Sequence, residues 1–262
     1  MGIRRPLIGG NWKMHGDLAS CVELTEDLVA SVCSGGVLEK VDVAIYPPFP
    51  YIQAVGHALR HHEIDLGGQD CSPFQEGPYT GQTSPAMLAD LGVSTVLVGH
   101  SERRHGLDET DALIAAKLKA ALAAELIPVL CVGETSEQRD SGVAHDVVAN
   151  QVRAGLEGLS QDDVGILSIA YEPVWAIGTG KTATPDDAQQ AHAMVRELLS
   201  SLYDVELAEA VRIIYGGSVK ASNAAELFAC PDVDGGLVGG ASLKSEEFAE
   251  ICQAALTMVA HA

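Results

Sequence analysis

The segment GILSIAYEPVWAIGTGKT (residues 165–182) joins an apolar run to a loop that contains a proline, two glycines and two large apolar side chains. The run ends at one carboxylate, Glu172, and Pro173 follows it directly. Loops normally present polar side chains to water, so Trp175 and Ile177 suggest a loop that closes over a ligand and excludes water. From this segment alone, an ordinary strand–helix connection with a partly buried tryptophan is an equally good interpretation, and Glu172 as a base beneath a lid is a hypothesis.

A helix is predicted shortly after this loop. Thr184 suits the N-cap, Pro185 suits the first helical position, and Asp186 and Asp187 place carboxylates in the first turn. Apolar residues then recur at spacings of three and four, which marks one buried helix face. They are Ala188, Ala191, Val195, Leu198, Leu199 and Leu202. Residues 165–202 therefore read as one strand, one loop and one helix.

The same unit recurs along the chain as a short apolar, β-branched run followed by a turn and a helical pattern. The eight runs lie near Pro6–Asn11, Val41–Tyr46, Ile64–Gly68, Thr95–Gly99, Ile127–Val132, Gly165–Tyr171, Arg212–Gly216 and Asp234–Val238. Several lack the alternation of a half-exposed sheet, as is typical of buried parallel strands. No linker or change of composition divides the chain. The sequence predicts an α/β fold with eight parallel strands, and a single-domain (β/α)8 barrel over residues 1–262 fits this length better than an open doubly wound sheet.

The composition argues against several classes of partner. The 262 residues carry a formal net charge of −20 at pH 7, which disfavours nucleic acid and anionic membrane surfaces. The chain has no run of about 18 apolar residues, so no membrane span is predicted. The first residues lack an apolar signal core, so we expect a cytoplasmic protein. The six cysteines are scattered without a C-x-x-C pair, and the histidines lack metal-ligand spacing. We predict neither a metal nor a cofactor.

Two polar residues lie at the end of the first run, at a place where barrels of this kind build their active sites. Asn11 and Lys13 are two positions apart, so they point to the same side of an extended chain. An amide and an ammonium group there would bind an anion or polarise an oxygen. Taken by itself, a surface lysine after a strand is the commoner case.

A histidine, His100, follows the fourth run, and a lone histidine at a strand end is more often a hydrogen-bonded structural residue. Ser101 could cap a short helix whose N-terminal N–H groups would lie near His100. The positive helix end would lower the pKa of His100, and a neutral imidazole could polarise a carbonyl group. We expect Glu102 to form an ion pair with an arginine.

Glycine pairs follow the last two runs, as Gly216-Gly217 before Ser218 and as Gly239-Gly240. Such pairs let the backbone approach a ligand, and their N–H groups form a phosphate cradle that needs no lysine. A phosphate site usually lies at this place in a (β/α)8 barrel. Backbone dipoles would thus provide a local positive potential in an acidic protein.

The third unit carries an unusually long connection, Cys71–Pro85. Long loops in compact domains are functional, interfacial or disordered, and the aromatic residues Phe74 and Tyr79 argue against disorder. We interpret this loop as a surface that inserts into a second subunit.

Together these residues resemble the triosephosphate isomerase family over essentially the whole chain. The motifs stand in the family's order: GNWK (10–13), VGHSERR (98–104), CVGE (131–134), AYEPVWAIGTGK (170–181), YGGSV (215–219) and VGGAS (238–242). The 170–181 motif is the most specific. The resemblance implies a TIM barrel and an isomerase of glycolysis and gluconeogenesis. Such an enzyme interconverts dihydroxyacetone phosphate and D-glyceraldehyde 3-phosphate through an enediol(ate).

The resemblance also implies a role for each residue. Glu172 is the base that moves a proton between C1 and C2 of the substrate. His100, neutral, hydrogen-bonds the substrate oxygens, and Lys13 stabilises the developing charge with Asn11 beside it. The residues that offer N–H groups to the phosphate are Gly178, Ser218, Gly239 and Gly240.

A lid and a homodimer follow from the same resemblance. The lid hinges are Pro173–Trp175 and Lys181–Ala183, and Trp175 packs against the protein body while the apolar tip excludes water. Thr80, in the long third loop, matches the residue that reaches across the dimer toward the partner's lysine. One departure is Asp70, where many relatives have asparagine, and an acid there could alter hydrogen bonds or the pH response.

Two other functions are weighed against this one. Another phosphate-binding barrel, such as an aldolase or an indole-forming synthase, is the nearest alternative, and an aldolase that forms a Schiff base would need a lysine inside a central strand. The lysines here lie at strand ends, in helical patterns or in loops. A catalytically silent scaffold would have lost Glu172, His100 or Lys13, yet all three are present.

Overall fold

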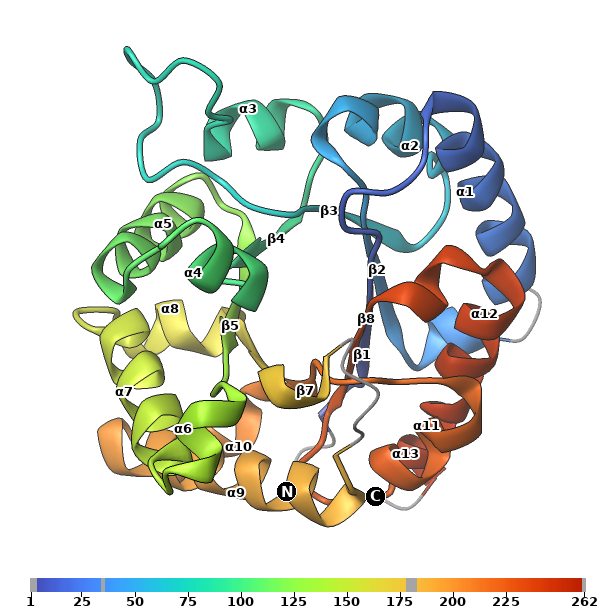
Figure 1. The fold of residues 1–262 in the computed structure, drawn as a ribbon. Coiled ribbons are helices and arrows are strands. Elements are labelled where there is room, and N and C mark those ends of the chain that lie inside the picture. Colours follow the sequence, from blue (N-terminus) through green and yellow to red (C-terminus); the bar gives the residue numbers. More distant parts are fainter. Residues whose placement is uncertain (1–3, 34–35, 178–182, 261–262) are drawn as a thin grey trace.

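Eight parallel strands close into one barrel in the order of the chain (Figure 1). The structure is a computed structural model and describes residues 4–33, 36–177 and 183–260. The strands are β1 (Leu7–Asn11), β2 (Asp42–Tyr46), β3 (Ile64–Gly68), β4 (Thr95–Val98), β5 (Ile127–Val132), β6 (Ser168–Tyr171), β7 (Arg212–Tyr215) and β8 (Gly235–Val238). Each of the eight predicted runs contains one strand, and the predicted barrel is confirmed.

The sixth strand begins later than the sequence predicted. Gly165 and Ile166 are the last residues of a short helix, α8 (Gln161–Ile166). Ser160 caps this helix, because its side chain accepts a hydrogen bond from the N–H of Asp163 and the Asp163 carboxylate accepts one from the N–H of Ser160. This capping box stabilises the helix, so Gly165 and Ile166, the first residues of the predicted apolar run, are helical.

Helices form the outer ring of the barrel (Figure 1). They are α1 (Leu18–Cys33), α2 (Ile52–Ala58), α3 (Pro85–Asp90), α4 (Ser101–Gly106), α5 (Asp111–Ala123), α6 (Ser136–Asp140), α7 (Ala144–Leu156), α8, α9 (Pro185–Leu202), α10 (Val205–Ala210), α11 (Ala221–Phe228), α12 (Ser245–Ala254) and α13 (Leu256–Ala260). Short 3-10 helices are η1 (Val37–Glu39), η2 (Phe49–Tyr51), η3 (Val174–Ala176) and η4 (Gly240–Leu243). None of the helices in the described ranges is both long and apolar enough to cross a membrane.

The helix after the opening segment forms as predicted. The Thr184 hydroxyl accepts a hydrogen bond from the N–H of Asp187, and the Asp187 carboxylate accepts one from the N–H of Thr184. Pro185 is the first residue of α9. Ala188, Val195, Leu198 and Leu199 of the predicted apolar stripe are buried, whereas Leu202 at the helix end is exposed. The stripe packs α9 against the barrel.

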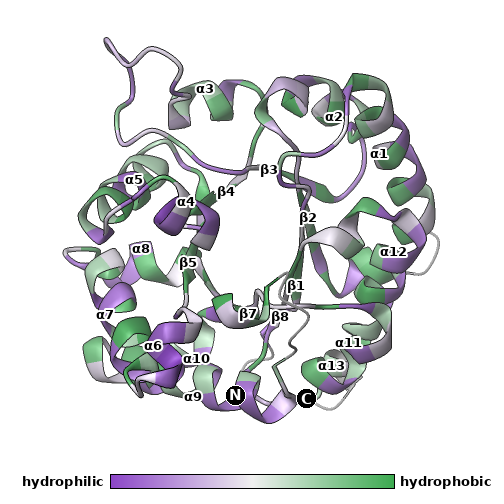
Figure 2. Cartoon of the chain, viewed as in Figure 1, coloured by the Kyte–Doolittle hydropathy of each residue, from purple (hydrophilic) through white to green (hydrophobic). Residues whose placement is uncertain are grey.

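The core has two shells. The outer shell lies between strands and helices, and long helices such as α1 and α12 carry both hydrophobic and hydrophilic residues (Figure 2). The inner shell fills the barrel with side chains of Leu7, Ala44, Tyr46, Leu97, Val129, Cys131, Ala170, Ile214 and Leu237. Because these side chains fill the barrel, a ligand can bind only at the ends of the strands.

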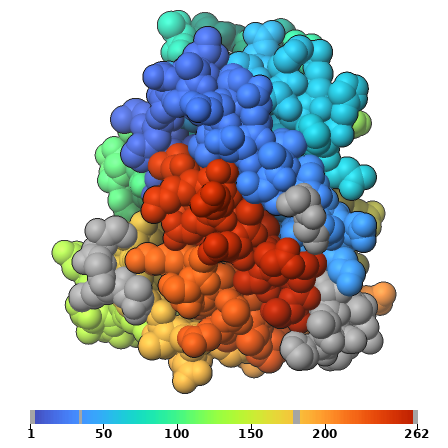
Figure 3. All heavy atoms as spheres, turned by 90° about the vertical axis from the view of Figure 1, so that its right-hand side faces the viewer, coloured from blue at the N-terminus to red at the C-terminus, as the bar shows by residue number. Residues whose placement is uncertain are grey.

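The two ends of the chain meet where the barrel closes. Leu7 in β1 lies opposite Gly235 in β8, and Arg4 binds the Asp234 carboxylate at 2.6 Å. The space-filling view shows the N-terminal residues (blue) directly against the C-terminal ones (red), and α1 contacts α12 (Figure 3). The closure thus depends on residues from both ends of the sequence.

Gly235→Ala is expected to destabilise the barrel by more than about 3 kcal/mol. Gly235 has φ +136°, and a Cβ atom there would lie 2.0 Å from the carbonyl oxygen of Leu7. Gly92→Ala is the matched control, because Gly92 also has a positive φ, +81°, but a Cβ there would meet nothing within 4 Å. The control should cost about 1–2 kcal/mol. Urea unfolding of both variants measures the difference, and equal losses would contradict the proposed clash.

Candidate active site

The predicted residues gather around one cavity at the carboxyl ends of the strands. The cavity has a volume of about 390 Å³. It is lined at the ends of β1, β4, β6, β7 and β8 by Asn11, Lys13, His100, Glu172, Ser218, Gly239 and Gly240, among others. Every predicted site residue within the described ranges therefore borders the same space, whereas Gly178 and the hinge residues Lys181 and Thr182 lie outside those ranges.

Glu172 is held at the centre of this cavity and is 1% exposed. One carboxylate oxygen, Oε1, lies 2.8 Å from Nε2 of His100. The other, Oε2, accepts a hydrogen bond of 2.8 Å from the N–H of Ser101. The main-chain N–H of Glu172 donates to the carbonyl of Val132 at 2.7 Å. Both the side chain and the backbone of this carboxylate are therefore fixed.

Two glycines make room for Glu172: Gly133, which had no predicted role, and Gly216, which was predicted to belong to the phosphate cradle. A Cβ atom on Gly133 would lie 1.7 Å from the main-chain oxygen of Glu172. A Cβ atom on Gly216 would lie 2.8 Å from Cγ of Glu172. These glycines belong to the CVGE and YGGSV motifs, so the sequence contained both of them. The reason why each must be glycine appears only in the fold, where β5 and β7 lie on either side of β6.

His100 is the N-cap of α4, and Ser101 is the first residue of the helix. The sequence analysis expected Ser101 to be the cap, and that expectation is wrong. Nδ1 of His100 accepts a hydrogen bond of 3.2 Å from the N–H of Glu102. In a neutral imidazole the proton therefore sits on Nε2, which donates to Glu172. The expected proximity of helix N–H groups to His100 is confirmed.

The pKa values of this pair differ from the sequence expectation. Burial lowers the pKa of His100, but the Glu172 carboxylate outweighs it and the pKa is raised. Burial raises the pKa of Glu172. His100 and the Ser101 N–H lower this pKa by more than burial raises it, so the pKa of Glu172 is lowered overall. The lowered pKa predicted for His100 from the helix end alone is therefore wrong. A ligand oxygen placed between the two groups would remove the contact and leave burial to act, which favours neutral His100 and a stronger base.

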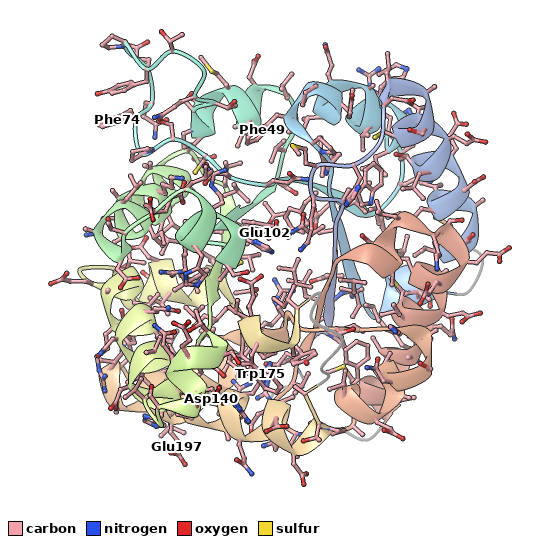
Figure 4. The ribbon with its side chains drawn as sticks, viewed as in Figure 1. Phe49, Phe74, Glu102, Asp140, Trp175 and Glu197 are labelled. Carbon is pink, nitrogen blue, oxygen red and sulfur yellow. The ribbon has the colours of Figure 1, made fainter. Side chains whose placement is uncertain are left out.

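Lys13 lies beside this pair in a strained conformation with φ +52°. Its N–H donates to Oδ1 of Asn11 at 3.0 Å, and its carbonyl accepts a hydrogen bond of 2.8 Å from Gln69. Its ammonium group contacts Glu102 at 2.6 Å, and Figure 4 places Glu102 on the side of α4 that faces the barrel mouth. Glu102 therefore pairs with Lys13, which follows β1, and not with the expected arginine.

Another side of the cavity, next to Lys13, is built from glycines. A Cβ atom on Gly240 would meet nothing within 4 Å, and one on Gly239 would lie 3.5 Å from Cε of Lys13. The 3-10 helix η4 begins at Gly240, and the first N–H groups of a helix have no partner within it. Lys220 and Lys244 also line the cavity. This side offers N–H groups and positive charge to an anion.

Trp175 packs against the protein body, as the sequence analysis expected. Its Nε1 donates to Oε1 of Glu134 at 2.8 Å, and the guanidinium of Arg139 lies 4.3 Å from the centre of its ring. Figure 4 shows Trp175 at the inner rim of the barrel, next to the carboxyl end of β6. Glu134, which binds Trp175, had no predicted role although its motif was recognised. Gln69, which follows β3 and binds the carbonyl of Lys13, was not predicted either.

A buried carboxylate and imidazole, a nearby ammonium group and a glycine-lined anion cradle at the mouth of this fold define a phosphate-binding (β/α)8-barrel enzyme. The family model of triosephosphate isomerase matches residues 6–255. The chain therefore belongs to the triosephosphate isomerase family.

Similar proteins from several bacteria carry the same name. A triosephosphate isomerase of Carboxydothermus hydrogenoformans is 50% identical over 254 residues, which cover 97% of this chain and 100% of the relative. Those of Chloroherpeton thalassium and Pseudomonas fluorescens are 48% and 50% identical, cover 97% of this chain, and are themselves covered to 100% and 99%.

Glu172→Gln should lower the pKa of His100 below its ordinary value of about 6.5. The variant removes the charge that raises this pKa and leaves the burial that lowers it. Titration of the imidazole resonances by NMR measures the shift. His192 is an internal reference, because its burial lowers its pKa to about 4 without any contact to Glu172. An unchanged pKa of His100 would contradict the role of the carboxylate.

Proposed function

We propose that this chain interconverts dihydroxyacetone phosphate and D-glyceraldehyde 3-phosphate in glycolysis and gluconeogenesis. The observation that carries the proposal is the contact of 2.8 Å between Glu172 and His100, buried beside a cavity with an anion-binding side. No cofactor is needed, because the reaction moves one proton between adjacent carbons.

In this proposal Glu172 takes the proton from C1 of dihydroxyacetone phosphate and returns it to C2. A proton next to a carbonyl group is weakly acidic, so a base works only when the charge that develops on the oxygen is stabilised as it forms. His100 is placed for this task. Its Nε2–H donates to Oε1 of Glu172, and it would donate to the substrate oxygen once that oxygen lies between the two groups. Lys13 adds positive charge beside the same oxygen, with Asn11 fixing its backbone.

The phosphate group does not react, but it anchors the substrate. We propose that Ser218, Gly239 and Gly240 offer N–H groups to it, with Gly178 joining them from the lid. Phosphate binding energy can then drive closure of the loop between the hinges Pro173–Trp175 and Lys181–Ala183. The Trp175 side chain, bonded to Glu134, supports the first hinge as a fixed end of that loop.

The structure disfavours the main enzymatic alternative. The residues of the eight strands include no lysine, which an aldolase of the Schiff-base class would need. Lys117 is buried in α5, but it is bound to Asp70 and Glu109 at 2.7 and 2.5 Å.

We propose a single cytoplasmic domain for the whole chain, with free cysteine thiols at all six positions.

Glu172→Asp should lower kcat about 100-fold or more with little change in KM, because the carboxylate withdraws by one methylene while the phosphate cradle is intact. A coupled assay that follows the isomerisation of glyceraldehyde 3-phosphate measures both constants. Glu23→Asp, an exposed change on α1, is the matched control and should leave both constants as they are. Near-normal turnover of Glu172→Asp would refute Glu172 as the base, and an inactive unaltered protein would refute the function.

We also propose a homodimer through the Cys71–Pro85 loop. The loop projects from the barrel, and Phe74 lies on its outer part (Figures 1 and 4). The rings of Phe74 and Tyr79 stack with centroids 3.9 Å apart while remaining 43% and 37% exposed. Exposed, ordered aromatic rings are typical of protein interfaces. Thr80, next to Tyr79, would then lie near the site of the second copy.

Tyr79→Asp should shift the protein from dimer to monomer, raising the dissociation constant at least about 30-fold, since buried aromatic anchors contribute 2 kcal/mol or more. Val205→Asp is the matched control, because Val205 is 66% exposed on another part of the surface. Sedimentation velocity over a dilution series distinguishes the two. A dimer unaffected by Tyr79→Asp would place the interface elsewhere, and a monomeric unaltered protein would refute the dimer.

A further inference from the structure

Arg104 is a buried arginine that binds the main chain at two strand ends. Its side chain is 7% exposed. Nε donates to the carbonyl of Gly99 at 2.8 Å, and Nη2 donates to the carbonyl of Cys131 at 3.0 Å. Nη1 binds Oδ1 of Asp111 at 2.6 Å. One planar group from α4 therefore joins the ends of β4 and β5 to the start of α5.

These contacts lie where the strands separate. The register between β4 and β5 ends with Val98 opposite Leu130, so Gly99 and Cys131 come directly after it. Gly99 turns the chain out of the sheet with φ +78°, and a Cβ atom there would lie 3.1 Å from Nη2 of Arg104. The guanidinium thus bridges two carbonyls beyond the last paired residues.

Both bridged carbonyls belong to segments that hold the reacting pair. Gly99 directly precedes His100, and Ser101 follows with the N–H that binds Glu172. Cys131 lies opposite Ala170 in the register and directly precedes Val132, whose carbonyl accepts the N–H of Glu172. A shift of either carbonyl would therefore move one member of the pair relative to the other.

We propose that Arg104 is a positioning residue for the isomerisation, in which its guanidinium sets the separation of His100 and Glu172 by binding the carbonyls of Gly99 and Cys131 together. This inference rests on the proposed function. Arg104 does not border the cavity, so it acts through the two strand ends and not by contact with the substrate. Lysine could not replace it, because an ammonium group is a point donor and lacks the fixed fork of a guanidinium.

The test is chemical rescue of Arg104→Ala. Misplacing a reacting group by about 1 Å can cost about 100-fold in rate, so we expect kcat to fall by that order. KM should change less than about threefold, because the phosphate cradle at β7 and β8 is untouched. Millimolar guanidinium chloride should restore at least a tenth of the lost kcat by entering the vacated space, whereas equal concentrations of urea or sodium chloride should not.

Two control variants separate positioning from general stability. Arg4→Ala removes a similar arginine, 16% exposed, that binds two carboxylates and the carbonyls of Glu209 and Pro231 at the other end of the barrel. It should lower stability but leave kcat unchanged and show no rescue. Asp111→Asn removes the ion pair of Arg104 but keeps both carbonyl contacts, so its kcat should stay within about threefold of the unaltered protein.

Each outcome is decisive. If Arg104→Ala loses no more kcat than Arg4→Ala, or if its loss is not reversed by guanidinium, Arg104 is structural and the inference fails. If Arg104→Ala does not fold, Arg104→Lys takes its place, and a kcat within about threefold of normal in that variant would overturn the inference. Absence of turnover in the unaltered protein would instead refute the proposed function, so the two failures are distinct.

Discussion

The burial of an ionised carboxylate is the constraint on which this site depends. A carboxylate removed from water is destabilised by several kcal/mol unless donors replace the lost hydration. Glu172 meets that requirement with Nε2 of His100 and the N–H of Ser101, both from the turn after β4. That turn exists because Gly99 takes a positive φ. Hence the conformation of one glycine determines whether the base can be buried at all.

The neighbours of β6 are shaped by the same constraint. The backbone of Glu172 passes so close to Gly133 that no side chain fits there, and Gly216 leaves room for its Cγ from the other side. The ends of both neighbouring strands, β5 and β7, therefore give up a side chain for one residue. Because these strands are buried in the barrel, the backbone of Glu172 is held in place at the cavity.

Much of the fold could be predicted from the sequence, because strands and caps are local signals. The eight apolar runs, the cap of α9 and the strand-end positions of Asn11, His100 and Glu172 all follow from periodicity and turn chemistry. Two of the errors are long-range. Glu102 was assigned an arginine because the sequence shows neighbours along the chain, whereas barrel closure brings Lys13 beside it. The pKa of His100 was assigned the wrong direction because its carboxylate partner comes from β6.

The acidity of the chain explains why the anion side of the cavity uses so much backbone. With a net charge of −20, the protein as a whole repels a phosphate dianion. Two of the lysines that line the cavity also attract carboxylates: Lys13 is paired with Glu102, and Lys244 with Glu247 at 3.2 Å. Main-chain N–H groups at η4 cannot be neutralised in this way, because a carboxylate side chain would have to enter the space that the glycines leave open. The main-chain N–H groups of these glycines are therefore the hydrogen-bond donors that remain available for the ligand in an acidic protein.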